Sequence, residues 1–581
     1  MYVQRGWVGS GSDLQHLRPL TPLAMAALQH EYMYDAVTEL FTDILNHFPA
    51  FLTDNDFRTL SIFLSTDDAR DVVSRLKGGD FDEDTMSFAK LLLAYGDAAV
   101  QDLAQKSDNA QLDRILYQLL QFLNCGEYGG VEDEVCSQAL EFWTTYTEFV
   151  IDSLFDHEED RPTWINVARQ RIEAVIEACW VKIRMPPHEV AVTWDSDARL
   201  SFKNFRKDVH DLLQSSYRLL GVEIFEKLAH LALQSLNDRA WLPFEATLFC
   251  LNALADLVAD DGSVDGMLAK VFASSLFADM ANTSENIPAK TRQTAVSMIS
   301  SYTSFFERHN EHLPGMLNFL FESLKSPALA NVVAKAIFST CSSCRKTLTS
   351  ELGAFLQQYE AVLTWNTIET NIKEKLVGAI ASIIQALQRD EDKIAPLIQV
   401  IQTVEKDAGR YMQALKSSNT EESQENGISA LKCLVSMGKA LQAPDEAVID
   451  LDVEAAQSTF WTEGQGALLQ VRIVRILESM TVLMKRNSDA IEAGCQILRV
   501  GCKERTAGLF VFPLKITVNF VLASRLDTAR LDCVLDTAGI CLTSRANDTE
   551  SAMNNAASTF LTHQLGLISM LGCRQILRST A

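Results

Sequence analysis

The stretch "TRQTAVSMISSYTSFFERHN" (residues 291–310) carries apolar residues at the period of an α-helix. Ala295, Ile299, Tyr302 and Phe306 follow one another at spacings of four, three and four residues, which places them on one helix face. The opposite face carries small polar and charged side chains: Ser297, Ser301, Ser304 and Arg308. The pattern predicts an amphipathic helix with one buried face.

The same pattern recurs along the chain after short breaks, for example at Pro314, while Pro327 is expected to open the following helix. Each helix has about two to five turns and each pair spans about 35–45 residues, which gives about a dozen repeats. A helix pair cannot bury its apolar stripe alone, so neighbouring pairs must stack. The sequence therefore predicts an all-α, right-handed α-solenoid (superhelix) of HEAT or armadillo-like helix pairs. Its further stripes are Leu313, Met316, Leu320, Leu324; Leu329, Val332, Val333, Ala336, Ile337, Cys341, Cys344; Leu348, Leu352, Phe355, Tyr359; Leu376, Ile380, Ile383, Leu387; and Ile394, Leu397, Ile398, Ile401.

No linker divides the chain into separate domains. Residues 1–24 are expected to be irregular, and residues 25–581 to form one continuous solenoid. Two polar stretches, 417–427 and 442–458, are predicted to be acidic loops, since the first has three glutamates and the second has five carboxylates and no Lys or Arg. Such loops can capture a basic partner by long-range attraction or act only as solubilising insertions.

Composition limits the classes of function. The chain has 581 residues, 47% of them hydrophobic, and a formal net charge of −25, so it can bury a large core and repels phosphate backbones. Direct DNA binding is disfavoured, and basic protein partners are favoured. The first residues lack the apolar core of a signal peptide, no segment has the uninterrupted apolar length of a membrane span, and twelve cysteines are too sparse for a disulfide scaffold. We expect a soluble protein of a reducing compartment, without membrane insertion.

Cys341 and Cys344 form the single C-x-x-C of the chain. A redox role needs a thioredoxin-like strand context, and a zinc site needs a second ligand pair at finger spacing; neither is present nearby. Both cysteines continue the apolar stripe of their helix, so we expect them to be packing residues.

Two other clusters contain metal-ligating residue types, "DHEED" (156–160) and "HNEH" (309–312), and we expect both to be solvated helix ends. The chain has no H-E-x-x-H, no G-x-x-x-x-G-K-[ST], no G-x-G-x-x-G after a strand and no G-x-S-x-G. The sequence therefore predicts no catalytic residue, no metal site and no cofactor.

Several stretches resemble the importin-β superfamily of nuclear transport receptors, and within it the importin-13/transportin-3 branch. They are "TRQTA…MI" leading into "HNEHL", the "CSSCRKTL" segment with its following helix (341–360), "FRKDVHDLLQSSYRLLG" (205–221), and "FEATLFCLNALADLV" (244–258). The resemblance covers most of residues 25–575. It rests on diffuse repeat positions and implies the fold more strongly than the branch.

The resemblance implies a karyopherin that binds cargo protein for nucleocytoplasmic transport, with import as the expected direction. Its implied partners are basic cargo proteins, the small GTPase Ran in its GTP form, and the phenylalanine-glycine repeats of nuclear pores. Its implied localisation is nucleus and cytoplasm, with shuttling between the two. Binding, not catalysis, would be its mechanism.

The stretch "DAIEAGCQILRVGCKERTAGLF" (489–510) is similar to an arginine-rich, cargo-contacting helix of that branch. Arg499 and Lys503 match basic positions and are the predicted partner-binding residues, whereas Ala493 and Gln496 stand where the branch has arginine. Superfamily members are considerably longer, so we expect the chain to be truncated at both ends and to lack the N-terminal repeats that bind Ran.

Two other functions stay open at this stage. One is a static HEAT-repeat scaffold that holds a protein complex together without Ran. The other is an enzyme that depends on metal or thiol reactivity at Cys341 and Cys344. Ran binding would separate the receptor from the scaffold, and loss of activity on replacing Cys341 would identify the enzyme.

Overall fold

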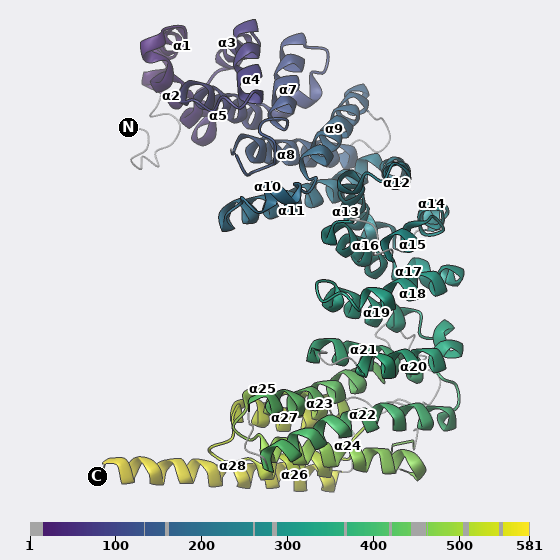
Figure 1. Cartoon of the computed structure of the whole chain (residues 1–581). Helices are drawn as coiled ribbons and strands as arrows, with labels where there is room; N and C mark the ends of the chain where they lie inside the picture. Colours follow the sequence, from purple (N-terminus) through teal and green to yellow (C-terminus); the bar gives the residue numbers. More distant parts are fainter. Residues whose placement is uncertain are drawn as a thin grey trace. The chain divides into compact units, whose positions relative to one another are not determined.

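The structure, a computed structural model, describes residues 15–132, 134–156, 162–259, 262–281, 287–364, 369–416, 421–442, 460–461, 463–502, 510–544 and 550–579. Across these ranges the chain forms 28 α-helices, six short 3₁₀ helices and no strand, so the predicted all-α class is confirmed (Figure 1). The chain divides into two compact units, residues 1–276 with 285–301, and residues 277–284 with 302–581.

Unit 1 stacks its helices in two layers. One layer is a row in which each helix packs against the next: α2, α5, α8, α11, α13 and α16. The second layer contains α4, α7, α9 and α12, which pack on the first, with α3 beside α7 and α14 beside α12. The helices are α1 (Thr21–Ala27), α2 (Tyr34–His47), α3 (Asp54–Leu64), α4 (Asp67–Lys77), α5 (Glu83–Ala98), α6 (Val100–Gln105), α7 (Ala110–Phe122), α8 (Val135–Asp156), α9 (Thr163–Lys182), α10 (His188–Ala191), α11 (Ser196–Leu220), α12 (Val222–Asn237), α13 (Trp241–Val258), α14 (Asp265–Phe272) and α16 (Ala289–Ser301), with 3₁₀ turns η1 (Gln15–Leu20), η2 (Glu31–Met33), η3 (Pro49–Phe51) and η4 (Gly262–Val264).

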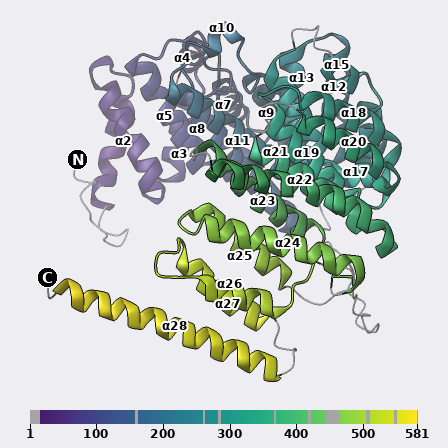
Figure 2. The same cartoon turned by 60° about the horizontal axis from the view of Figure 1, so that its bottom comes forward.

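Unit 2 has the same two-layer order. One row runs α19, α21, α23, α25 and α27, and the other runs α22, α24, α26 and α28, with each helix packed on its neighbours. Figure 2 shows the C-terminal end of these two rows, where α28 lies beside α26 and α27. The helices are α15 (Leu276–Ala281), α17 (Thr303–Arg308), α18 (Leu313–Ser323), α19 (Ala330–Ser343), α20 (Leu352–Leu363), α21 (Thr370–Gln385), α22 (Asp390–Lys416), α23 (Glu421–Ala440), α24 (Gly464–Leu483), α25 (Ser488–Gly501), α26 (Leu514–Ala523), α27 (Leu531–Thr543) and α28 (Glu550–Ser579), with η5 (Asn310–His312) and η6 (Thr347–Glu351).

Local sequence sets where many of these helices begin. Thr53 and Asp56 form a reciprocal capping box at the start of α3, since the side chain of each accepts from the backbone N–H of the other. Asn109 caps α7, Asp195 caps α11 and Asn487 caps α25 in the same way, each accepting from a first-turn N–H. These caps satisfy donors that the helix itself leaves unpaired.

The apolar stripe at 291–310 is buried as predicted, but its helix is interrupted. Ala295, Ile299, Tyr302 and Phe306 are all buried, at 3% exposure or less. However, α16 ends at Ser301 and α17 starts at Thr303. The hydroxyl of Ser301 donates to the carbonyl of Ser297, and such back-bonding from serines bends or ends helices.

Three predicted boundaries differ from the structure. Residues 15–24 are not irregular, because η1 and α1 place Leu17 and Leu20 against α2. The first predicted acidic loop is wrong over 421–427, because α23 begins at Glu421. Pro327 lies in a turn three residues before α19, instead of opening it. Residues 1–14, 417–420 and 443–458 lie outside the described residues.

One helix of the described chain, α13, is long and apolar enough to cross a membrane by composition. Most of it is buried, because it packs against α11, α12 and α16. In this fold it is a core helix of unit 1.

A buried ion pair ties three helices of unit 1 together. The guanidinium of Arg206 (α11) donates to both carboxylate oxygens of Glu245 (α13), at 2.9 and 2.8 Å, and to the carbonyl of Ile183 at 2.8 Å. Thr294 (α16) donates its hydroxyl to the same carboxylate at 2.7 Å. Glu245 is fully buried, so its charge depends on these partners.

We expect Glu245→Leu to lower the free energy of unfolding by about 3–5 kcal/mol, because it leaves the buried Arg206 charge unpaired. The double substitution Arg206→Met with Glu245→Leu removes both charges and should recover most of that loss. Urea denaturation followed by circular dichroism measures both. A double variant that is no more stable than Glu245→Leu would contradict this role for the pair.

Close helix contact in unit 2 depends on a missing side chain at Gly378 (α21). A Cβ there would lie 2.7 Å from the ring of Phe338 (α19) and closer still to the hydroxyl of Ser436 (α23). Gly378→Ala should therefore destabilise unit 2 by about 1–3 kcal/mol through overpacking.

Gly409 is the matched control for this substitution. It lies inside α22 with no atom within 4 Å of its would-be Cβ, so Gly409→Ala should stabilise the chain by up to about 1 kcal/mol through helix propensity. Thermal melts of the two variants should shift in opposite directions. Equal shifts would show that the approach of α19, α21 and α23 is not limited by this glycine.

Candidate functional site

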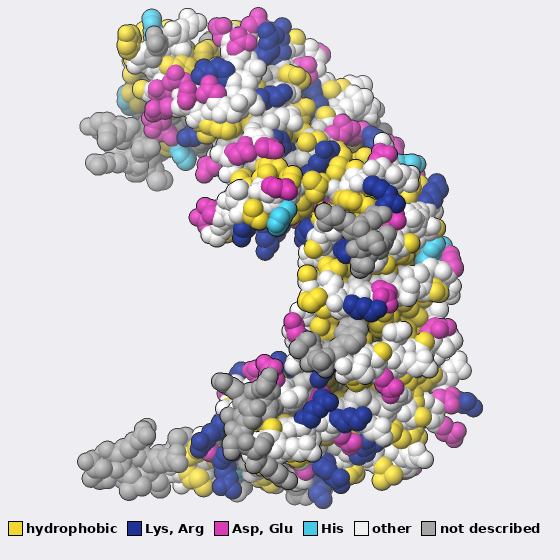
Figure 3. Space-filling model, in the orientation of Figure 1, with side chains coloured by type: hydrophobic (Ala, Val, Ile, Leu, Met, Phe, Trp, Pro, Cys, Tyr) yellow, Lys and Arg dark blue, Asp and Glu magenta, His cyan; other side chains and the backbone are white. Residues whose placement is uncertain are grey.

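A hollow of about 690 Å³ opens on unit 1 beside α10 and α11, and we call it the basic hollow. Its volume lies in the range of ligand-binding clefts. Lys and Arg side chains gather along the edge of the segment formed by α10 and α11 (Figure 3). The residues that line it are Met185, Pro186, Ala191, Trp194, Arg199, Phe202, Lys203, Asn204, Arg206, Lys207, His210, Asp211, Phe249 and Lys290.

The amphipathic pattern of α11 supplies the cations. Arg199, Lys203 and Lys207 recur at every fourth residue, so they form one row on the helix, and all three are exposed. Phe205 and Val209 of the same helix are buried, at 1% and 4% exposure, and hold α11 in the first layer. The helix thus faces the core on one side and carries positive charge on another.

Aromatic side chains form one wall of the basic hollow. Trp194 packs edge-on against Phe202 and against Tyr128, with ring centroids 5.2 and 5.3 Å apart. On the other side, the Arg206 guanidinium lies 4.2 Å from the ring centre of Phe249. Trp194 is half-buried, so part of its ring is open to a ligand.

The cations of the basic hollow differ in how they are partnered. Lys203 and Lys207 make no hydrogen bond or ion pair with the part of the chain that the structure describes. Arg199 reaches only the carbonyl of Ala191, at 3.5 Å. Partial burial lowers the pKa of Lys290; the negative charge of Glu245 opposes this shift, and the positive charges of Arg206 and Lys203 add to it.

Lys290 and Asp211 complete the charged lining. The ammonium group of Lys290 donates to the side chain of Gln293. Asp211 is the single carboxylate of the lining and lies 3.1 Å from the Nδ1 atom of His210. The hollow therefore offers several exposed positive charges and little negative charge to oppose them.

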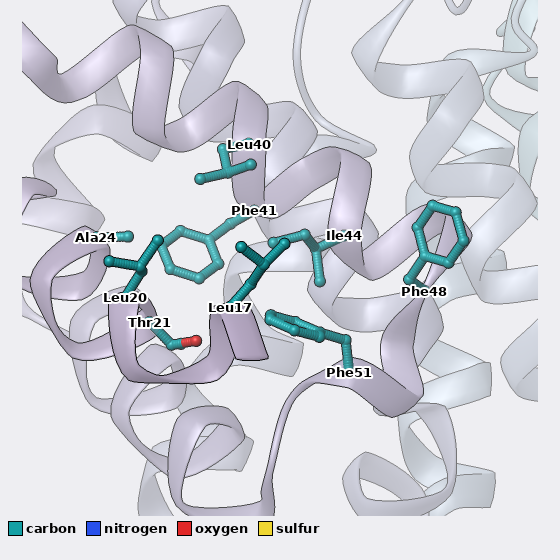
Figure 4. A pocket seen from close by; sticks show the side chains of 9 residues that line it. All are labelled: Leu17, Leu20, Thr21, Ala24, Leu40, Phe41, Ile44, Phe48 and Phe51. Atoms are coloured by element: carbon teal, nitrogen blue, oxygen red, sulfur yellow. The ribbon is translucent and has the colours of Figure 1, made fainter. Parts of the chain in front are cut away.

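A second, smaller hollow of about 180 Å³ lies at the first helices of unit 1 and is apolar (Figure 4). Leu17 and Leu20 of η1 face Phe41 and Ile44 of α2, and Phe51 closes one side. It offers no charged or titratable side chain, so it can pack an apolar group but has no chemistry beyond that.

The two predicted partner-binding residues have different outcomes. Lys503 lies outside the described residues. Arg499 is half-buried on α25, and its guanidinium is used inside the unit: Nε donates to the hydroxyl of Thr537 at 2.9 Å, and Nη2 donates to the carbonyl of Cys533 at 3.2 Å. These bonds join α25 to α27.

The two cysteines of the C-x-x-C motif are packing residues, as predicted. Cys341 and Cys344 are 0% and 1% exposed. Burial raises the pKa of both thiols, that of Cys344 to about 12, which disfavours the reactive thiolate form.

The two predicted solvated clusters contain metal-ligating residue types. At "HNEH", His309 and His312 stack on Phe305, with ring centroids 4.7 and 5.7 Å apart. Over the residues described, no group of three His, Cys, Asp or Glu side chains lies close enough to hold a metal ion. Residues 157–160 of "DHEED" are not described.

Sequence reasoning missed the basic hollow. Its cations lie in the stretch "ARLSFKNFRK" (198–207), where the four-residue spacing of Arg199, Lys203 and Lys207 was a visible signal. The rest of the hollow comes from the segment that precedes α11 (185–194), from the following turn of α11, from Phe249 of α13 and from Lys290 of α16. No local pattern shows that these segments meet.

Comparison with known proteins adds independent support for the fold and the family. Residues 272–358 match the family model of the third TPR domain of transportin-3/importin-13. The importin beta-like protein kap111 of Schizosaccharomyces pombe is 25% identical over 76% of this chain and 44% of its own length. Human importin-13 is 22% identical over 68% of this chain and 41% of its own length.

Solved structures of importins have a similar fold. Importin13 in its cytosolic state superposes on 97% of this chain with a TM-score of 0.75 at 16% identity, over 64% of its own length. A crystal structure of importin beta superposes on 96% of this chain with a TM-score of 0.56 at 12% identity. The fold is therefore that of the HEAT solenoids, as predicted.

The chain spans less than half the length of the curated relatives it matches. Those relatives carry the names importin beta-like protein and importin. Family model, relatives and fold point the same way: the chain is similar to importin-β-like karyopherins, and within them to the importin-13/transportin-3 branch.

Proposed function

We propose that this chain acts as a nuclear transport receptor that binds cargo protein for Ran-regulated transport, in the import direction. The observation that carries this proposal is the similarity of most of the chain to the importin beta-like protein kap111 and to importin-13. Its two-layer stack of helices also suits this role, because a solenoid offers a long surface to a protein partner.

The proposed partners follow from charge and family. A net charge of −25 favours cargo proteins with basic surfaces and disfavours direct DNA binding. The Asp54–Asp84 segment alone places acidic first turns on α3, α4 and α5. Ran in its GTP form and phenylalanine-glycine repeats are the other proposed partners, and the proposed localisation is shuttling between nucleus and cytoplasm.

The proposed mechanism uses the stacked architecture. Each helix pair contacts only its neighbours, so small changes at successive contacts add up along the array. Ran-GTP that binds one state of the array more tightly than another shifts the chain toward that state and changes its affinity for cargo. No covalent step is involved.

Arg499 and Lys503 stay predictions for cargo contact. The bonds from Arg499 to Thr537 and Cys533 use its Nε and Nη2 atoms, which leaves Nη1 for an outside acceptor. A cargo contact there would therefore be added to a structural role within α25 and α27.

A pull-down with purified chain tests this function. Immobilised chain should retain Ran loaded with a GTP analogue and not Ran loaded with GDP, and GTP-loaded Ran should release bound nuclear proteins. It should also retain a phenylalanine-glycine repeat peptide but not the same peptide with serine for phenylalanine.

Three outcomes are informative. Retention of GTP-loaded Ran with release of cargo supports the receptor. Retention of nuclear proteins with no effect of Ran and no repeat binding favours the static HEAT scaffold instead. Equal retention of both Ran forms would contradict the proposed regulation, because a switch needs a difference in affinity between the two states.

A further inference from the structure

The basic hollow reverses the charge of the chain locally. The protein carries a net charge of −25, yet the lining holds Arg199, Lys203, Lys207 and Lys290 against the single carboxylate of Asp211. Arg206 is also present, but Glu245 neutralises it inside the core. Lys207 interacts electrostatically with its neighbour Asp208, but no hydrogen bond or ion pair within the described residues holds Lys203 or Lys207. Like charges four residues apart destabilise a helix, so an external anion would stabilise this row of cations.

The spacing of the row indicates the form of that anion. Residues four apart on a helix lie about 6 Å apart along its axis, so Arg199, Lys203 and Lys207 present charges at about that interval. In an extended peptide, alternate side chains lie on one side and about 6.6 Å apart. Carboxylates at every second residue of an extended segment therefore match the row.

The aromatic wall indicates a second feature of the ligand. Trp194 is held by Tyr128 and Phe202 and keeps part of its ring open, next to the first turn of α11. An apolar side chain of the ligand can pack against this ring at low entropic cost, because the ring is already fixed. The basic hollow thus combines an apolar contact at Trp194 with the row of cations formed by Arg199, Lys203 and Lys207.

A phosphate backbone also has regularly spaced anions, but the rest of the molecule disfavours it. A polyanion longer than the hollow extends along a chain whose net charge is −25, which repels it. A short acidic segment within a protein ends before that repulsion outweighs the local attraction.

We propose that the basic hollow binds an extended acidic segment of a cargo protein, with carboxylates at alternate residues along Arg199, Lys203 and Lys207 and one apolar side chain against Trp194. The identity of the partner as cargo rests on the proposed function, whereas the chemistry of the segment rests on the hollow alone. This surface is distinct from the acidic surfaces that favour basic cargo, so one cargo can use both.

Fluorescence anisotropy with the full chain tests the proposal. The probe is a labelled peptide with one leucine followed by four glutamates at alternate positions, separated by serines. At about 50 mM salt we expect Lys203→Gln with Lys207→Gln to weaken binding about five- to tenfold, and to reduce its salt dependence. Trp194→Ala should weaken it about three- to tenfold.

Lys90→Gln is the matched control, since Lys90 is an exposed lysine on α5 of the same unit, away from the hollow. It should leave peptide affinity unchanged. A peptide with glutamine for glutamate should bind at least tenfold more weakly. Circular dichroism confirms that each variant keeps its helical content.

Two results would overturn the proposal: equal affinity of the Lys203/Lys207 double variant and wild type, or tighter binding of a single-stranded RNA oligonucleotide than of the acidic peptide. Ran is absent from this assay. Failure of peptide binding therefore leaves the pull-down with Ran as a separate test, and failure of Ran binding leaves the peptide result intact.

Discussion

The structure depends on one constraint: an amphipathic helix pair leaves its apolar stripe exposed unless another pair covers it. The rows α2–α5–α8–α11–α13–α16 and α19–α21–α23–α25–α27 are the result, because each helix in a row covers the stripe of the one before it. Close approach within a row needs small residues, and Gly378 meets that need between α19 and α23. Each added helix pair therefore increases both the stability of the stack and the length of its surface.

Polar chemistry is built on the same rows. The ion pair of Arg206 and Glu245 is buried between α11, α13 and α16, where Thr294 also donates to the carboxylate. This network fixes the position of α11, and α11 in turn carries the exposed row of Arg199, Lys203 and Lys207. A buried, neutralised pair thus holds an exposed, unneutralised set of charges in place. The three cations therefore keep their relative positions even when no ligand is bound.

Much of the fold was predictable because its signal is local. The apolar stripe from Ala295 to Phe306 and the burial of Cys341 and Cys344 follow from helical spacing alone. The break at Tyr302 was not predictable from apolar spacing, because serine hydroxyls compete for the backbone there. The helix over 421–427 was missed because polar composition describes exposed helix starts as well as loops. The basic hollow joins segments from Met185 to Lys290, and only packing brings them together.

The proposed function requires the chain to cross nuclear pores. The most direct measurement is the entry of fluorescently labelled chain, 64.6 kDa in mass, into nuclei of permeabilised cells. If the proposed function is right, the labelled chain accumulates at the nuclear rim and inside the nucleus. An excess of unlabelled importin then reduces this accumulation, because both compete for the same pores. Exclusion from the nuclei, equal to that of an inert protein of the same size, would contradict the proposed function.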